Sequence, residues 1–385
     1  MKDFPGTVGG QDLTAAGMAR HDPSTFRFRR IRISLSGQVF NDFGFFIESE
    51  INGGSIGTRV DEAWGSYTYA PWAKVTVGQH KPRFGLENLT SSRDLDFAER
   101  TVIARALSPD YQLGATVEGN VKLANMPIYY GVGIYNGCGR VDQCSGGIDN
   151  DGDKEFTGRV AFSPPMPFGQ LTIGLNADHR TFSVVRGNGA TDANSVTTPV
   201  GGTSSFHRFN PVGPTNVRLA GNGVGVTQNG FLINGDRNTG GGDIVFDFYP
   251  FVIKGEYAYA SQERDALGAG GSNLDGLVMQ GGHGSIGYWI FSNKRSGLLA
   301  NARYEYLRVE DNSGKFSTPD SAKNEVPLEI ESGTLGLTWY VNPSVRLRGN
   351  YIVTDLSPNR NQVGMSNSHG SNVAHQGIAE LMVQF

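Results

Sequence analysis

The sequence lacks any long hydrophobic run. No stretch approaches the roughly 20 apolar residues that a membrane-spanning helix needs, so a helical membrane protein is excluded. Charged residues are only 18% of the 385 residues and the net charge is −4, so we expect no nucleic-acid partner. A barrel of membrane-spanning strands is not excluded, because such strands alternate apolar and polar residues and average to neutral hydropathy.

Motifs for metal binding or catalysis are also missing. The two cysteines, Cys138 and Cys144, form no CxxC pair, and the seven histidines show no HExxH spacing. No Gly-x-Ser-x-Gly elbow is present. We therefore predict no cofactor, no metal and no enzymatic activity. The two cysteines lie close together in a Gly-rich segment, which favours a disulfide formed outside the cytosol, although two free thiols stay open as an alternative.

The sequence does contain many segments of about ten residues that alternate apolar and polar side chains. In the stretch from Val345 to Val353, Leu347 and Tyr351 fall on one face while Arg346 and Arg348 fall on the other. Period-two alternation of this kind predicts strands. Comparable segments are Leu171–Arg180, Phe251–Ala260 and Leu299–Val309.

The links between these segments alternate between short turns and long loops rich in Gly, Asn and Ser. A soluble sandwich also alternates along its strands, but alternating link lengths and aromatic residues near strand ends are typical of outer-membrane barrels. The sequence therefore predicts an all-β fold, a transmembrane antiparallel β-barrel with short periplasmic turns and long extracellular loops. We expect a single domain, residues 1–385. About fifteen strands are recognisable, with a weak sixteenth within residues 6–18, and an even number favours sixteen.

If the apolar faces meet lipid, the polar faces line a lumen. Charges facing lipid at mid-depth would cost about 2–4 kcal/mol for Arg or Lys, so the charged residues of the strands are assigned inward. The inward set is Arg30, Arg32, Lys74, Arg159, Lys254, Arg303, Arg346, Arg348, Glu48, Glu50, Glu118, Asp178, Glu256 and Glu305.

Three segments stand out against this pattern. The alternation of Phe26–Ile33 changes phase between Arg29 and Arg30, which suggests a bulge that aims arginines into the channel; a basic strand end facing lipopolysaccharide is the alternative. The charged loop at about residues 81–111 is expected to fold inward and constrict the pore, with a solvated surface loop as the alternative. A long extracellular loop is expected at about residues 181–240.

Several motifs, in order and spacing, resemble the phosphate-selective porin O and P family. They are Phe28-Arg29-Arg30, Val60-Asp61-Glu62-Ala63, Lys74–Gly78, Phe84-Gly85-Leu86-Glu87, Thr90-Ser91-Ser92, Glu99-Arg100, Leu335–Asn342 and the closing strand to Phe385. The match covers about residues 24–120 and 330–385. The resemblance implies a trimeric, sixteen-stranded barrel with an inward loop and arginines that lead anions to a central site.

By position, Arg29, Arg30 and Arg100 match basic pore residues of the family, and Asp61 matches an acidic residue beside its site. Two lysines of the family's phosphate porins are replaced here by Asn88 and Gly44. The family is therefore a firmer expectation than its substrate.

The sequence thus predicts a passive porin of the bacterial outer membrane that conducts small hydrophilic solutes with a preference for anions, with phosphate as a candidate. The predicted pore residues are Arg29, Arg30, Arg32, Asp61, Arg100, Arg346 and Arg348. Expected partners are outer-membrane lipid, lipopolysaccharide, small anionic solutes and further copies of the chain in a homotrimer. The alternatives are a non-specific diffusion porin, a plugged structural barrel and a lipid-interface barrel enzyme.

Overall fold

A computed structural model gives the fold. It describes residues 26, 28, 30–51, 58–139, 153–182, 208–209, 231–232, 235–263, 276–293, 296–311, 328–358 and 373–384.

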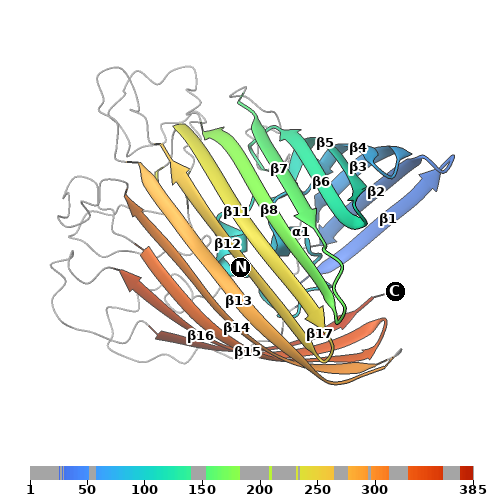
Figure 1. The fold of residues 1–385 in the computed structure, drawn as a ribbon. Helices are drawn as coiled ribbons and strands as arrows, with labels where there is room; N and C mark the ends of the chain where they lie inside the picture. The colour runs from blue at the N-terminus through green and yellow to red at the C-terminus, as the bar shows by residue number, and fades with distance from the viewer. Residues whose placement is uncertain are drawn as a thin grey trace, which may run out of the picture.

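Fifteen strands form one antiparallel sheet in which each strand pairs with its neighbours along the chain (Figure 1). These strands are β1 (Ile31–Val39), β2 (Phe43–Ile51), β3 (Thr58–Ala70), β4 (Ala73–His80), β5 (Gln112–Leu123), β6 (Met126–Tyr135), β7 (Glu155–Phe162), β8 (Gln170–Phe182), β11 (Gly235–Phe248), β12 (Phe251–Gln262), β13 (Leu277–Ser292), β14 (Gly297–Asp311), β15 (Leu328–Asn342), β16 (Val345–Pro358) and β17 (Val373–Val383). The sheet bends into a curved wall, which confirms the predicted all-β, antiparallel fold.

Four small elements complete the description. β9 (Arg208–Phe209) pairs with β10 (Phe231–Leu232), and α1 (Leu86–Leu89) and α2 (Val102–Ala106) lie in the segment between β4 and β5. None of the helices described is long and apolar enough to cross a membrane. Within the described part of the chain, β1 and β17 do not pair with each other. The sixteenth strand expected within residues 6–18 lies outside the described residues and stays a prediction.

The predicted alternation of short and long links agrees with the strand bounds. A short turn that was not predicted from the sequence lies at Ala124 and Asn125, between β5 and β6. Both residues have positive φ, 48° and 66°, as a two-residue turn of type I′ requires. The loop expected at about residues 181–240 is shorter than predicted, because β8 continues to Phe182 and β11 begins at Gly235. Most of that loop lies outside the described residues.

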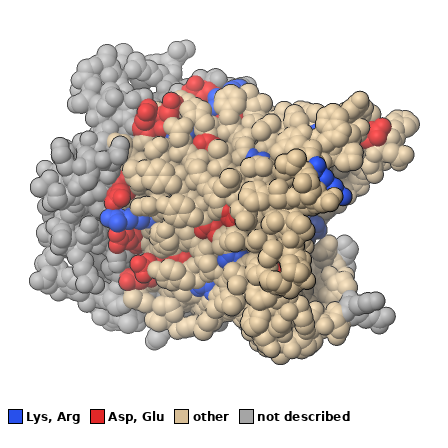
Figure 2. Space-filling model, in the orientation of Figure 1, with Lys and Arg blue, Asp and Glu red and all other residues tan. Residues whose placement is uncertain are grey.

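The two faces of the wall differ as the alternation predicts. In β7, Glu155, Thr157 and Arg159 are buried while Phe156 and Val160 are exposed. On four other strands, the charged side chains Asp178, Glu256, Arg303, Glu305 and Arg348 are likewise buried on the inner face. Much of the outer face seen in Figure 2 is uncharged. The inner face is therefore the polar one.

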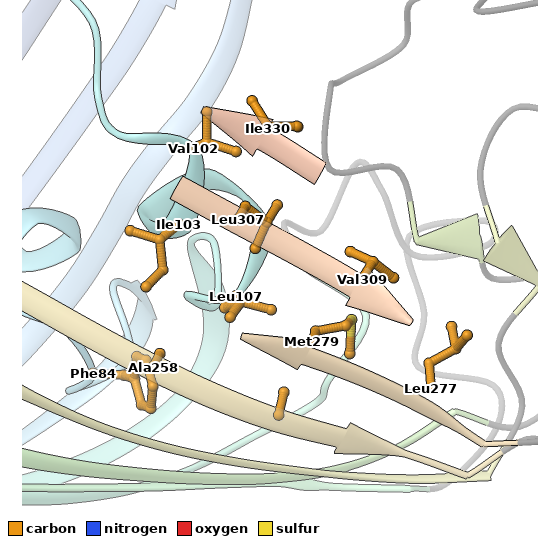
Figure 3. Close-up of a cluster of buried hydrophobic side chains, with 11 residues drawn as sticks. Phe84, Val102, Ile103, Leu107, Ala258, Leu277, Met279, Leu307, Val309 and Ile330 are labelled. Atoms are coloured by element: carbon orange, nitrogen blue, oxygen red, sulfur yellow. The ribbon is translucent and has the colours of Figure 1, made fainter. Parts of the chain in front are cut away.

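One sector of the inner face is apolar instead. Ala258, Ala260, Leu277, Met279, Leu307, Val309 and Ile330, from β12 to β15, form a buried cluster with Phe84, Val102, Ile103 and Leu107 of the segment 81–111 (Figure 3). Burying a Leu or Ile side chain contributes about 1.5–3 kcal/mol. The cluster therefore holds the segment against the inside of the wall.

The predicted disulfide can be checked at only one of the two cysteines. Cys138 is disulfide-bonded. Cys144, the other cysteine of the chain, lies outside the described residues.

Candidate functional site

Residues 81–111, named here the inward segment, lie inside the curve of the wall and contact its inner face at several strands. Lys254 Nζ of β12 lies 2.5 Å from Asp96 Oδ2. Asn301 of β14 and Thr338 of β15 donate to the carbonyl of Asp96 at 3.1 and 3.0 Å. The inward segment therefore occupies part of the lumen.

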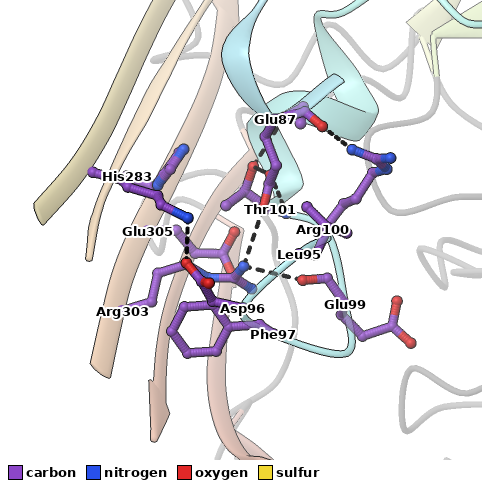
Figure 4. A network of polar contacts seen from close by, with 12 residues as sticks. Glu87, Leu95, Asp96, Phe97, Glu99, Arg100, Thr101, His283, Arg303 and Glu305 are labelled. Atoms are coloured by element: carbon purple, nitrogen blue, oxygen red, sulfur yellow. Dashed lines mark hydrogen bonds and ion pairs between the residues drawn. The ribbon is translucent and has the colours of Figure 1, made fainter. Parts of the chain in front are cut away.

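A buried ion-pair network fixes the middle of the inward segment (Figure 4). The guanidinium of Arg303 lies 3.4 Å from Glu87 Oε1 and 3.1 Å from Glu305 Oε1, and it donates to the carbonyl of Glu99 at 3.0 Å. Glu87 also accepts from the backbone N–H of Thr101 at 2.8 Å and from its hydroxyl. Thr101 in turn caps α2 by accepting from Ala104 N.

Electrostatics keep the Glu87 carboxyl charged. Burial alone would raise its pKa, but the Arg303 guanidinium, His283 and the hydrogen bonds from Thr101 lower the pKa below that of an ordinary glutamate. A buried carboxylate is stable only with such partners. Glu87 therefore joins α1, α2 and the wall.

Two predicted pore arginines of β16 also hold the inward segment. Arg348 donates to the carbonyls of Leu95 and Phe97 at 2.8 and 3.1 Å and lies 2.8 Å from Glu380. Arg346 donates to the carbonyl of Arg93 and stacks 4.3 Å over the ring of Tyr340. The hydrogen bonds of both guanidiniums to the inward segment end on backbone oxygens.

Arg32 and Asp61 meet in a compact charged cluster on β1 to β3. The guanidinium of Arg32 lies 2.7, 2.8 and 2.9 Å from Glu48, Glu50 and Asp61. Asp61 has no exposed surface and also pairs with Arg59 at 2.8 Å. The register between β2 and β3 passes from Glu62 to Val60 and skips Asp61, so Asp61 is the extra residue of a bulge. Arg32 is thus neutralised by carboxylates.

Arg100 donates to backbone carbonyls of the inward segment. Its guanidinium donates to the carbonyls of Glu87 and Thr90, the second at 2.6 Å. Lys81 shares the Thr90 carbonyl with it: Lys81 Nζ donates to Asn88 O at 2.7 Å and to Thr90 O at 3.5 Å. The same ammonium lies 5.3 Å from the centre of the Tyr111 ring. Two cations therefore converge on one stretch of backbone.

Their surroundings distinguish these two cations from most basic residues of the inner wall and of the inward segment. Arg32, Lys74, Arg83, Arg159, Lys254, Arg303 and Arg348 each have a carboxylate oxygen within 4 Å. Among the described residues, neither Lys81 nor Arg100 has one. Burial lowers the pKa of Arg100, and burial together with the Arg100 charge lowers the pKa of Lys81 to about 7.

The structure thus brings together only part of the predicted site. Arg32 and Asp61 are in contact, and Arg100 lies in the inward segment. Arg30 precedes β1 and is exposed, and Arg29 lies outside the described residues. Sequence reasoning missed Lys81 and Tyr111. Both residues lie at the ends of the inward segment. Because both ends of such a segment must lie at the wall, this position could have identified them from the sequence.

Known proteins with similar sequences include porins. The family model for phosphate-selective porin O and P matches residues 8–385. Porin O of Pseudomonas aeruginosa is 25% identical over 376 residues, covering 87% of this chain and 78% of that protein. These relatives are porins, which are channels rather than enzymes.

Solved structures show the same fold at low sequence identity. The trimer form of OmpT, an outer membrane protein of Vibrio cholerae, has a TM-score of 0.50 at 13% identity, covering 92% of this chain and 91% of that one. The outer membrane channel DcaP of Acinetobacter baumannii has a TM-score of 0.50 at 11% identity, covering 92% and 83%. The chain belongs to the phosphate-selective porin O and P family and is a β-barrel porin of the bacterial outer membrane.

Proposed function

We propose that this porin passively conducts small hydrophilic solutes with a preference for anions, phosphate among them, and catalyses no reaction. The observation that carries the proposal is the pair formed by Lys81 and Arg100, two half-buried cations without a carboxylate within 4 Å among the described residues. An anion beside them would supply the missing negative charge.

The preference comes from the position of these cations rather than from the total charge of the lumen. On β1 to β3, Glu48, Glu50 and Asp61 share two guanidiniums, those of Arg32 and Arg59, so this wall is slightly acidic. Selectivity in a pore is set by the charges at its narrowest part. The inward segment places Lys81 and Arg100 there in this proposal, and the other arginines of the wall mainly keep the segment in place.

Conduction also requires that an anion leave the site. Both cations already donate to backbone carbonyls, which compete with the anion for their N–H groups. A site of this kind replaces part of the hydration shell while binding weakly, and weak binding permits passage. Arg346, next to the tip of the inward segment, adds a further positive charge along the proposed path.

The partners belong to the same proposal. The family and the trimer form of OmpT support a homotrimer. The exposed apolar side chains of the outer face, such as Leu35, Leu335 and Leu381, at 62–64% exposure, support contact with the lipid and lipopolysaccharide of the membrane.

The test is single-channel recording in a planar bilayer, with reversal potentials in a KCl gradient and added phosphate. We expect discrete steps, a reversal potential on the anion side and a conductance that falls as phosphate occupies the site. Arg100→Ser should reduce the anion preference. Arg308→Ser is the matched control, because Arg308 lies on the outer face with a side chain 46% exposed, and it should change nothing.

Other outcomes would count against the proposal. Discrete steps without anion preference would indicate a general diffusion porin. Absence of any conductance would indicate a plugged barrel or a barrel enzyme.

A further inference from the structure

We infer that Lys81 makes the anion preference of the channel depend on pH: the protonated lysine completes the anion site with Arg100, and loss of its proton weakens that site. This inference rests on the proposed function. It assigns to one residue a regulatory role that the anion preference alone does not require.

The geometry of Lys81 supports the first step. Its ammonium donates to the carbonyls of Asn88 and Thr90 and lies over the Tyr111 ring. These partners orient the ammonium but carry no net charge. A lysine in such a place shifts its protonation readily, whereas the guanidinium of Arg100 stays charged at any accessible pH. Lys81 is therefore the titrating member of the pair.

The charged groups around Lys81 have opposite effects on its protonation. Arg100 of the inward segment and Arg32 of β1 disfavour the charged lysine, while Glu62 of β3 and Asp110 favour it. Lys81 also interacts electrostatically with Glu48 of β2. Tyr111, whose pKa burial raises to about 12, stays neutral near neutral pH. Burial and the two guanidiniums outweigh the carboxylates, so the pKa of Lys81 falls to about 7.

The sign of the effect follows from linkage. An anion beside Lys81 favours the charged form, so binding of the anion takes up a proton. The charge of Lys81 is present below about pH 7 and is lost as the pH rises through that value. Anion preference should therefore be stronger in acid and weaker in base.

The measurement is the reversal potential of the whole protein in a KCl gradient at about pH 5.5 and about pH 8.5, where a group of pKa near 7 is almost fully charged or neutral. Chloride is the right probe, because its charge does not change between these pH values as that of phosphate does. We expect the ratio of anion to cation permeability to fall about twofold from the lower to the higher pH, the effect of one charge seen across water.

Two variants assign the effect to the residue. Lys81→Arg keeps the charge at both pH values and should hold the permeability ratio at its acid value. Lys81→Met should hold it near the basic value at both. Lys74→Met is the matched control: Lys74 also lies on the inner wall, but it pairs with Glu118 at 3.3 Å, and its loss should leave the pH dependence intact.

The possible failures are distinguishable. Absence of anion preference at either pH would overturn the proposed function itself. Anion preference that does not change with pH, or a change that persists in Lys81→Arg, would overturn only the role of Lys81. Because Lys81→Arg retains both charge and hydrogen-bond donors, it provides the test even if Lys81→Met does not fold.

Discussion

Arg303 contacts two glutamates at once, Glu305 on its own strand at 3.1 Å and Glu87 of the inward segment at 3.4 Å. Glu87 and Arg303 are 216 residues apart in sequence. This single guanidinium therefore links one carboxylate of the wall to one of the inward segment.

We expect removal of the Arg303 guanidinium and removal of the Glu87 carboxylate to differ in how much stability the inward segment loses. Glu87→Gln leaves Arg303 paired with Glu305, whereas Arg303→Met leaves two buried carboxylates without that guanidinium. Breaking a buried pair costs about 3–5 kcal/mol, so we expect Arg303→Met to loosen the inward segment more than Glu87→Gln. Protease sensitivity of residues 81–111 and the noise of the open channel measure this. Equal effects would show that Glu305 does not share the guanidinium.

The buried apolar cluster should also hold the inward segment against the wall, through the hydrophobic effect. Ile103 is almost fully buried, at 2% exposure, and Ile103→Ala would leave a cavity that costs about 2–5 kcal/mol. We expect faster hydrogen exchange in residues 84–107 without loss of the strands. Leu35→Ala, an exposed position of the outer face, serves as the control. Uniformly faster exchange in the strands as well would mean that the cluster stabilises the barrel and not the segment alone.

Asp61 should limit the anion preference. Asp61→Asn removes one negative charge from the inner wall while keeping the size of the side chain. One charge acting through water at about 8 Å is worth about 0.5 kcal/mol, or about twofold in a permeability ratio. We expect the reversal potential in a KCl gradient to move toward the anion side by this amount. Glu331→Gln, on the exposed outer face, should leave it unchanged, and a shift toward cations in Asp61→Asn would contradict the assignment.

Acid should release the inward segment. The pKa of Glu87 is lower in the folded protein than in an unfolded chain, so its carboxylate stabilises the segment above the ordinary glutamate pKa, and this stability is lost as the pH falls through the lowered value. Channel noise and hydrogen exchange of residues 84–107 should therefore rise in acid. Glu87→Gln should show no such step, and an identical acid step in that variant would assign the effect to another group.

The faces of the strands could be predicted from the sequence because they depend on neighbouring residues alone. Arg303 and Glu305 alternate with Tyr304 and Tyr306, and the prediction that charge faces inward holds. The same alternation places Leu307 and Val309 on the inner face as well. The change from charged to apolar along one face was visible in the sequence and marks where the inward segment packs.

The roles of individual cations could not be predicted. Arg348 is predicted to line the pore, and in the structure it donates to the carbonyls of Leu95 and Phe97, about 250 residues away in sequence. Arg32 finds its carboxylates on the next two strands, and Lys81 finds none within 4 Å among the described residues. Whether a cation is neutralised depends on register shifts such as the one at Asp61 and on the path of the inward segment. Neither is encoded in a local pattern.

The apolar sector of the inner wall constrains the order of assembly. Strands β12 to β15 have apolar side chains on both faces in that sector, and the inward segment covers the inner one. The segment is synthesised long before these strands, yet it packs against them from inside. We expect the wall to curve around a segment that is already in place, because a chain that closed first would leave a hydrophobic surface facing water in the channel.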